Sequence, residues 1–190
     1  MPEKKLIEAV DLCKYYKTPK GALHAVEGVN FTIDEGTTLG RTIMNLHDST
    51  SGKILFDGED VTHPNKAQKK MIHKNIQMIF QDPASSLDPR RCVNDLIAEP
   101  MKVMKLCKGK AELEKRVAEL MDTVGLARRY AFSYPHELDG GRRQRIGIAR
   151  ALSVSPRFIV CDEPVSALDV SIQAQILNLL QDLQEEHGLT

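Results

Sequence analysis

Two adjacent acids, Asp162 and Glu163, follow a short apolar run at residues 158–161. Such a run is typical of a buried strand, which delivers the residues after it to the carboxyl edge of a sheet, where ligands of α/β folds bind. At that edge the first carboxylate can hold Mg²⁺, and the second can polarise a water that attacks a phosphate. Considered alone, the pair is explained equally well by a strand that ends in a polar turn.

A pair of glycines, Gly140 and Gly141, stands directly before a basic stretch with helical spacing at residues 142–152. Glycines at a helix start leave backbone N–H groups exposed, and the helix dipole favours an anion at that end. The pattern is therefore compatible with an anion-binding helix start. A Gly-Gly turn before a basic helix is the simpler interpretation when the pair is considered alone.

The elements expected to position these residues begin with short strands. Apolar and polar residues alternate over residues 29–33, which predicts a half-buried strand. Residues 53–56 predict a strand that enters a hairpin turn at residues 57–58, because these are Asp-Gly. The apolar runs at residues 76–80 and 158–161 predict interior strands.

Helical spacing dominates later in the chain. Apolar residues recur every three or four positions over residues 113–124 and again over residues 172–183. Gly125 is placed to end the first of these helices. The strand signal disappears between residues 83 and 134, which predicts a helical lobe at about residues 84–145 inserted into an α/β core.

Composition narrows the classes of function. Lys plus Arg and Asp plus Glu each number 26, so the formal net charge is zero, which argues against a nucleic-acid binder. No apolar run has the roughly 18 residues of a membrane span, and no apolar segment follows Met1, so we expect neither a span nor a secretory signal. The four cysteines are scattered without a close pair, which predicts a reducing, cytoplasmic setting.

Four motifs in a fixed order resemble those of the ABC ATPase family. Residues 79–83 resemble its Q-loop, and residues 138–142 resemble its signature motif. Residues 158–162 resemble its Walker B motif, and residues 166–169 resemble its D-loop. The resemblance covers the chain from about residue 6 to the last residue.

Two further segments, residues 81–89 and 134–137, are similar to the ATPases of oligopeptide and dipeptide importers. The resemblance implies an α/β fold, with a P-loop NTPase-like ABC ATPase core, an antiparallel β subdomain and an inserted helical lobe. It implies a single nucleotide-binding domain over residues 1–190. It also implies an ATPase subunit that energises a peptide importer, with ATP and Mg²⁺ as cofactors.

The resemblance assigns roles at the Walker B and Q-loop positions. Asp162 would hold Mg²⁺, and Glu163 would polarise the attacking water. Gln81 would reach both the Mg²⁺ and that water while sensing the permease. Tyr16 would stack on the adenine, with Tyr15 as the other candidate.

It also assigns roles at an interface between subunits. Gly140 and Gly141 would contact the γ-phosphate of a nucleotide held mainly by a second ABC ATPase subunit, identical or paralogous. Asp139 and Arg142 complete this signature loop, and Asp169 would lie at the interface. Transmembrane permease subunits are the other expected partners, so we expect a peripheral location on the cytoplasmic face of the membrane, with no nucleic-acid partner.

The largest departure from the family is a missing phosphate-binding loop. A P-loop requires Gly-x-x-x-x-Gly-Lys-Ser/Thr, and no such octet occurs in the sequence. Its expected place follows residues 37–39, where the sequence instead runs through Gly40 into residues 41–44. Three explanations are open: a loop left out of the printed sequence, an engineered deletion and a natural loss. The first is favoured, because strand and helix would otherwise lack a connection.

Two smaller departures follow. Asp139 stands where the family has Ser, and Arg142 where it has Gln; the added carboxylate would repel a phosphate unless neighbouring arginines offset it. The sequence stops before the family's next strand and its switch histidine, so we expect a C-terminally truncated domain. His187 is a terminal helix residue and not that histidine.

Two alternative functions remain. A catalytically degenerate ABC subunit that serves as a dimer partner is supported by the missing loop and Asp139, whereas Glu163 argues against it. A non-transport ABC ATPase that acts on DNA or ribosomes is disfavoured by the zero net charge and by the lack of long heptad repeats.

Overall fold

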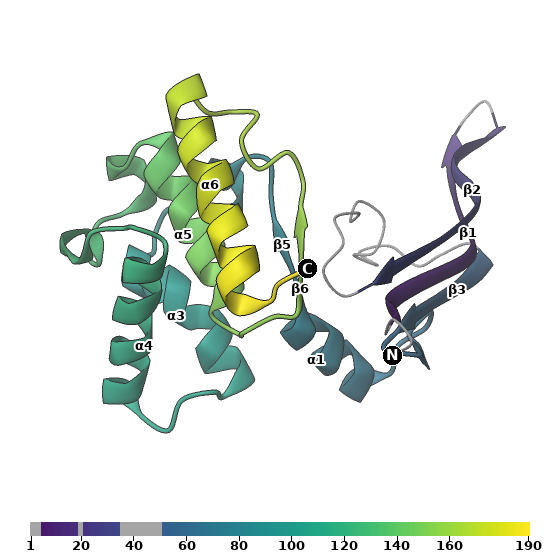
Figure 1. Cartoon of the computed structure of the whole chain (residues 1–190), viewed down its shortest axis with the longest axis horizontal. Helices are drawn as coiled ribbons and strands as arrows, with labels where there is room; N and C mark the ends of the chain where they lie inside the picture. Colours follow the sequence, from purple (N-terminus) through teal and green to yellow (C-terminus); the bar gives the residue numbers. More distant parts are fainter. Residues whose placement is uncertain (1–4, 19–20, 35–50) are drawn as a thin grey trace. The chain divides into compact units, whose positions relative to one another are not determined.

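The computed structural model describes residues 5–18, 21–34 and 51–190 (Figure 1). The chain divides into two compact units, with the boundary between His73 and Lys74. Each unit has its own secondary structure. Among the described residues, none of the helices has the length and apolar character that a membrane span requires.

The first unit contains a four-stranded sheet in the order β2-β1-β3-β4, in which all neighbours are antiparallel. Asp57 and Gly58 join the last two strands with positive φ angles of 53° and 82°, the conformation that favours Asp-Gly in a tight hairpin turn. The predicted hairpin is therefore confirmed. The strands are β1 (Lys5–Thr18), β2 (Gly21–Asp34), β3 (Ser51–Phe56) and β4 (Glu59–Asp60).

Helix α1 (Lys66–Asn75) follows this sheet and begins with a well-formed cap. Asn65 Oδ1 accepts hydrogen bonds from the backbone N–H groups of Ala67 and Gln68, and the Asn65 N–H donates to Gln68 Oε1. This reciprocal arrangement satisfies N–H groups that have no partner inside the helix.

The second unit contains two parallel strands, β5 (Ile76–Ile79) and β6 (Phe158–Cys161). Ile76 pairs with Phe158 and Ile79 with Cys161, so both strands end at the same edge. Both strands were predicted from their apolar runs and are confirmed. The helices of this unit are α2 (Pro83–Ser86), α3 (Val93–Met104), α4 (Lys110–Thr123), α5 (Gly140–Leu152) and α6 (Val170–His187).

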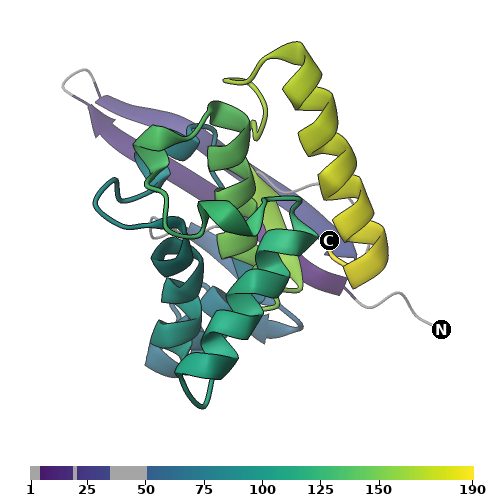
Figure 2. The same ribbon diagram turned by 90° about the vertical axis from the view of Figure 1, so that its left-hand side faces the viewer.

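Helix α5 is the central helix of the second unit. It contacts α2, α3, α4, α6 and β5, and it lies between α6 and the pair of α3 and α4 (Figures 1 and 2). Ile146 and Ile148 are fully buried on it, together with Met121 of α4 and Ile176 of α6. This packing fixes the start of α5 relative to α6.

The helical predictions are confirmed within this unit. Helix α4 contains residues 113–123 of the predicted range 113–124. Gly125 lies just beyond it in the left-handed region at φ 64°, as expected for a residue that ends a helix. Helix α6 covers residues 172–183. Between residues 83 and 134 the chain contains helices and turns with no strand, as the sequence predicted.

Candidate functional site

The carboxyl edge of β5 and β6 brings the two predicted motifs together. Gln81 follows β5, and Asp162 and Glu163 follow β6. Gln81 Nε2 donates a hydrogen bond to Glu163 Oε2 at 2.7 Å, and the Asp162 N–H donates to the Ile79 carbonyl at 3.0 Å. Residues about 80 positions apart in the sequence are thus in direct contact because two parallel strands end together.

Glu163 occupies an uncommon backbone conformation at this edge. Its φ is 44°, a region that residues other than glycine rarely adopt. The turn after it is closed by Ser166, whose N–H and Oγ both donate to the Glu163 carbonyl at 3.2 Å. Such conformations occur most often where the surrounding structure holds a functional side chain in place.

The carboxylates at this edge are suitable ligands for a hard cation such as Mg²⁺, which can bind phosphate oxygens at the same time. Asp162 and Glu163 offer carboxylate oxygens, and Mg²⁺ in phosphate sites needs only one or two of these besides the phosphate oxygens. Within the described part of the chain, no group of three or more His, Cys, Asp or Glu residues could hold a metal. Burial raises the pKa of the Cys161 thiol to about 11, so the residue before Asp162 stays neutral.

The start of α5 carries an ion pair within the signature motif. Asp139 is the N-cap residue, and its Oδ1 accepts the Arg142 N–H at 2.8 Å. Its Oδ2 accepts a hydrogen bond from Arg142 Nη1 at 2.6 Å. Asp139 and Arg142 are the two residues in which the sequence departs from the family's signature. Their charges neutralise each other, in agreement with the expectation that an arginine offsets the added carboxylate.

The signature glycines pack against the segment that follows the two acids. A Cβ atom at Gly140 would lie 3.0 Å from Leu168 Cδ2, and one at Gly141 would lie 2.8 Å from Ile172 Cγ2. The distance at Gly140 would be relieved by a shift of a few tenths of an ångström at the end of the Leu168 side chain. The distance at Gly141 is closer than Cβ atoms normally approach, so the close packing there favours glycine. Asp169 lies between those two contacts as the N-cap residue of α6, and its carbonyl accepts from the Ile172 N–H.

The predicted site residues thus fall into three groups. Gln81, Asp162 and Glu163 gather at the strand edge. Residues 139–142 form the start of α5, and Asp169 lies beside them at the start of α6. Tyr16 belongs to the first unit, where it pairs with Leu23 across the hairpin of β1 and β2. The expected place of the phosphate-binding loop, residues 37–44, lies outside the described residues.

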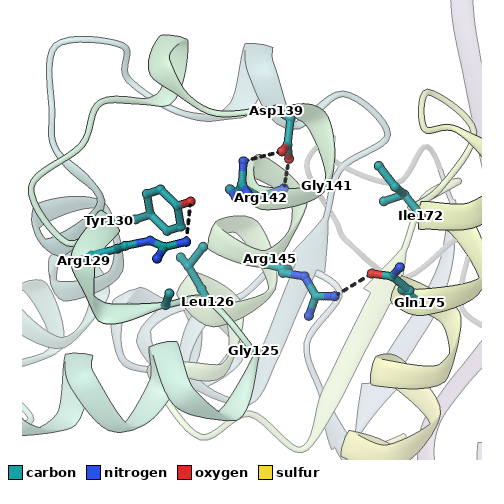
Figure 3. A pocket seen from close by; sticks show the side chains of 11 residues that line it. Gly125, Leu126, Arg129, Tyr130, Asp139, Gly141, Arg142, Arg145, Ile172 and Gln175 are labelled. Carbon is teal, nitrogen blue, oxygen red and sulfur yellow. Dashed lines mark hydrogen bonds and ion pairs between the residues drawn. The ribbon is translucent and has the colours of Figure 1, made fainter.

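Sequence reasoning missed a pocket beside the start of α5. Arg142 Cζ lies 4.8 Å from the centroid of the Tyr130 ring, and Arg129 Cζ lies 5.1 Å from it (Figure 3). The hydrogen bond from Arg129 to the phenol oxygen lowers the pKa of Tyr130. The only sequence signal for this pocket is the Arg-Arg-Tyr triplet at residues 128–130.

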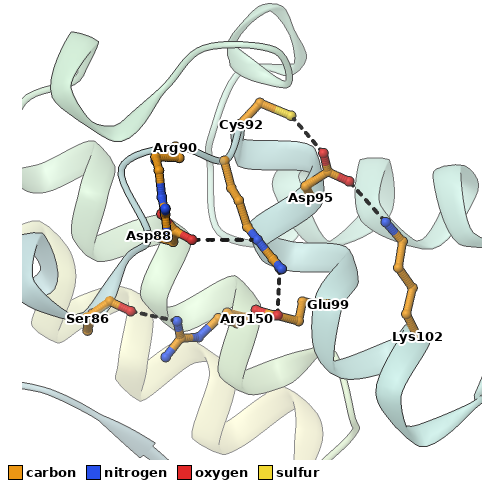
Figure 4. Close-up of polar contacts among 9 residues, drawn as sticks. Ser86, Asp88, Arg90, Cys92, Asp95, Glu99, Lys102 and Arg150 are labelled. Atoms are coloured by element: carbon orange, nitrogen blue, oxygen red, sulfur yellow. Dashed lines mark hydrogen bonds and ion pairs between the residues drawn. The ribbon is translucent and has the colours of Figure 1, made fainter.

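Residues 88–102 carry a network of ion pairs (Figure 4). Arg91 pairs with Glu99 at 2.5 Å, and Lys102 pairs with Asp95 at 3.0 Å. The hydrogen bond and charge of Lys102 lower the pKa of Asp95. Arg150 reaches the same region from α5, because its Nη1 donates to the Ser86 carbonyl at 2.8 Å.

The sequence matches the ABC transporter family over residues 36–166, which is more than half of the chain. The chain belongs to the ABC transporter family. Two curated relatives are similar over 98% of the chain. The oligopeptide transport ATP-binding protein OppF of Bacillus subtilis is 50% identical, and the dipeptide transport ATP-binding protein DppF of Lactococcus lactis is 46% identical.

The chain spans slightly less than two thirds of these relatives: 66% of OppF and 65% of DppF. The alignment with OppF runs over 201 residues, more than the 190 residues of this chain. OppF therefore has residues in the aligned region that this chain lacks.

Solved structures show the same fold. The dimeric structure of MJ0796, a bacterial ABC transporter cassette, matches 97% of this chain and 85% of its own chain, with a TM-score of 0.83 and 28% identity. The cbiO1 structure from Clostridium perfringens, part of the ABC transporter complex cbiONQ, matches 99% and 77%, with a TM-score of 0.80 and 26% identity. The chain therefore has the α/β fold of an ABC ATPase cassette, as the sequence predicted.

Proposed function

We propose that this chain is the ATP-binding and ATP-hydrolysing part of a subunit that energises an ABC importer of oligopeptides or dipeptides. The observation that carries the proposal is the hydrogen bond between Gln81 and Glu163, because it joins the Q-loop and Walker B motifs at one edge. The names of OppF and DppF support the substrate class.

The residues at the strand edge have complementary roles in this proposal. ATP with Mg²⁺ would supply the phosphoryl group and the charge that activates it. Asp162 would bind the cation, and Glu163 would accept a proton from the attacking water. The Gln81 amide holds the Glu163 carboxylate in position, so any movement of the Q-loop would change the orientation of the base.

The start of α5 would serve a second subunit. Gly140 and Gly141 present backbone N–H groups at a helix start, where a phosphate is favoured. The dimeric bacterial cassette that shares this fold supports an assembly of two such subunits. Transmembrane permease subunits would complete the transporter, with this subunit on the cytoplasmic face of the membrane.

A second candidate function is a catalytically degenerate subunit that supports an active partner. The specific observation in its favour is the missing Gly-x-x-x-x-Gly-Lys-Ser/Thr octet, together with the longer aligned region of OppF. The mass of the purified natural protein distinguishes the two candidates. An added mass that matches a P-loop between residues 38 and 42 supports the ATPase, and its absence supports the degenerate subunit.

The test of the main proposal is peptide-dependent ATP hydrolysis. The full-length subunit is assembled with its permease and partner subunits in proteoliposomes, and phosphate release is measured with and without a peptide substrate. We expect hydrolysis to rise with peptide and peptide to accumulate inside. If the rate of ATP hydrolysis is unchanged by peptides but rises with another solute, the proposed substrate class is wrong. If no ATP hydrolysis is detected, the proposed enzymatic role is wrong.

A further inference from the structure

Helix α1 carries a row of basic side chains along one face (Figure 1). Its sequence, KAQKKMIHKN, contains four lysines and one histidine but no acidic residue. The basic residues follow one another at the three- and four-residue spacing that places side chains on one face of a helix, and all of them are exposed. This α1 basic face consists of Lys66, Lys69, Lys70, His73 and Lys74.

The opposite face of α1 is half-buried. It consists of Gln68, Met71, Ile72 and Asn75, which also recur every three or four positions. Gln68 Nε2 donates a hydrogen bond to the carbonyl of Asp60 in β4 at 3.2 Å. Because this face packs and makes that hydrogen bond, the basic face is directed at solvent.

The charges of the α1 basic face are unbalanced. None of its four lysines forms an ion pair with a residue that the structure describes. On α4, by contrast, Lys110 and Lys115 each pair with a glutamate one turn later, at 3.6 Å and 3.7 Å. Like charges three or four positions apart repel, and cations are unfavourable at a helix N-terminus. The basic face therefore destabilises α1, and an anionic partner would offset that cost.

The chemistry of the α1 basic face favours a lipid surface over a nucleic acid. Lysine ammonium groups are hydrated point charges, whereas specific phosphate recognition uses the paired donors of arginine, which α1 lacks. Helix α1 also has no aromatic residue that could stack on a base, and the formal net charge of the chain is zero. The row extends for about 12 Å along the helix, so it can contact several neighbouring headgroups.

We propose that the α1 basic face binds the anionic headgroups of the cytoplasmic leaflet of a membrane. Clusters of about four to eight basic residues on an amphipathic helix are typical of such binding. The inference rests on the proposed function in one respect, because that function places the subunit at the membrane. The lipid contact would add to the contact with the permease and hold the subunit at the surface.

The test is co-sedimentation of the purified full-length subunit with lipid vesicles, in the absence of permease and nucleotide. One set of vesicles contains phosphatidylcholine alone, and the other also contains anionic phosphatidylglycerol. We expect binding to the anionic vesicles only, and this binding should weaken as salt is added. The double variant Lys66→Gln/Lys70→Gln should bind about 25-fold more weakly, since each lysine near an anionic surface contributes about fivefold. Lys66→Arg/Lys70→Arg keeps both charges and should retain binding.

The matched control is Lys110→Gln/Lys115→Gln on α4, which also removes two exposed lysines. Each of these is already paired with a glutamate, so the affinity for vesicles should change less than twofold. Thermal unfolding verifies that Lys66→Gln/Lys70→Gln is folded, because the loss of repulsion should keep or raise its midpoint.

Four results would each overturn the inference. These are equal binding to both kinds of vesicle, binding that salt does not weaken, equal weakening in the α4 control, and tighter binding to duplex DNA than to anionic vesicles. The assay contains neither ATP nor permease, so its failure is distinct from a failure of peptide-dependent ATP hydrolysis.

Discussion

The strand edge and the start of α5 position their functional residues by different means. At the strand edge, parallel pairing of β5 and β6 places Gln81 against Glu163 at 2.7 Å, and these residues follow the family's pattern. At the start of α5, the side chains of Asp139 and Arg142 depart from that pattern together and pair at 2.6 Å. The comparison indicates that backbone geometry fixes the chemistry of the edge, whereas charge balance at the signature depends on two side chains.

The largest expected effect tests the edge. Glu163→Gln, in the full-length subunit assembled with its permease, removes the proposed base and keeps the side-chain size. ATP hydrolysis should fall by about 10²–10⁴-fold, as for other general bases. ATP binding should persist, which an equilibrium assay with a fluorescent nucleotide measures.

The control for this variant is Glu114→Gln on the exposed face of α4, which also replaces one exposed carboxylate. It should leave hydrolysis unchanged. If the Glu163→Gln variant hydrolyses ATP at the normal rate, Glu163 is not the base. The strand edge would then not differ from the start of α5 by positioning a catalytic group.

The sequence predicted the edge better than the start of α5 for a physical reason. A short apolar run followed by acids specifies a strand and the edge where it ends, so the placement of Asp162 follows from local pattern alone. The positive φ of Glu163 and the contacts of Tyr130 do not follow from the local sequence pattern. They depend on turns whose conformation tertiary packing selects. The offset of Asp139 by an arginine was anticipated from charge, but the choice of Arg142 required the helix geometry.

A second prediction concerns the packing of the signature glycines. Gly141→Ala places a Cβ atom 2.8 Å from Ile172 Cγ2, so overpacking should lower the free energy of unfolding by about 1–3 kcal/mol. Gly147→Ala, on the same helix, meets no atom within 4 Å and should raise it by about 0.5–1 kcal/mol. Urea denaturation of the chain measures both, and equal midpoints would show that the glycines are not required for packing.

A smaller effect tests the cap of α5. Asp139→Ala removes the oxygen that accepts the Arg142 N–H, which should cost about 1 kcal/mol of unfolding free energy. Asp169→Ala is the matched control, because its side chain makes no capping hydrogen bond to the described residues of α6. Thermal unfolding should therefore separate the two variants, and an equal loss in both would contradict the cap.

The smallest effect decides whether the two departures at the signature act as a pair. Asp139→Ser keeps an oxygen for the cap and removes only the charge, while Arg142→Gln removes the opposite charge. In a double-mutant cycle, the coupling between these variants should be about 0.3–0.5 kcal/mol at low salt and should shrink as salt screens the charges. Each single variant leaves one charge unbalanced at the helix start, so the double variant should recover part of the loss. Zero coupling at low salt would mean that Asp139 and Arg142 changed independently, and the start of α5 would then be altered without compensation.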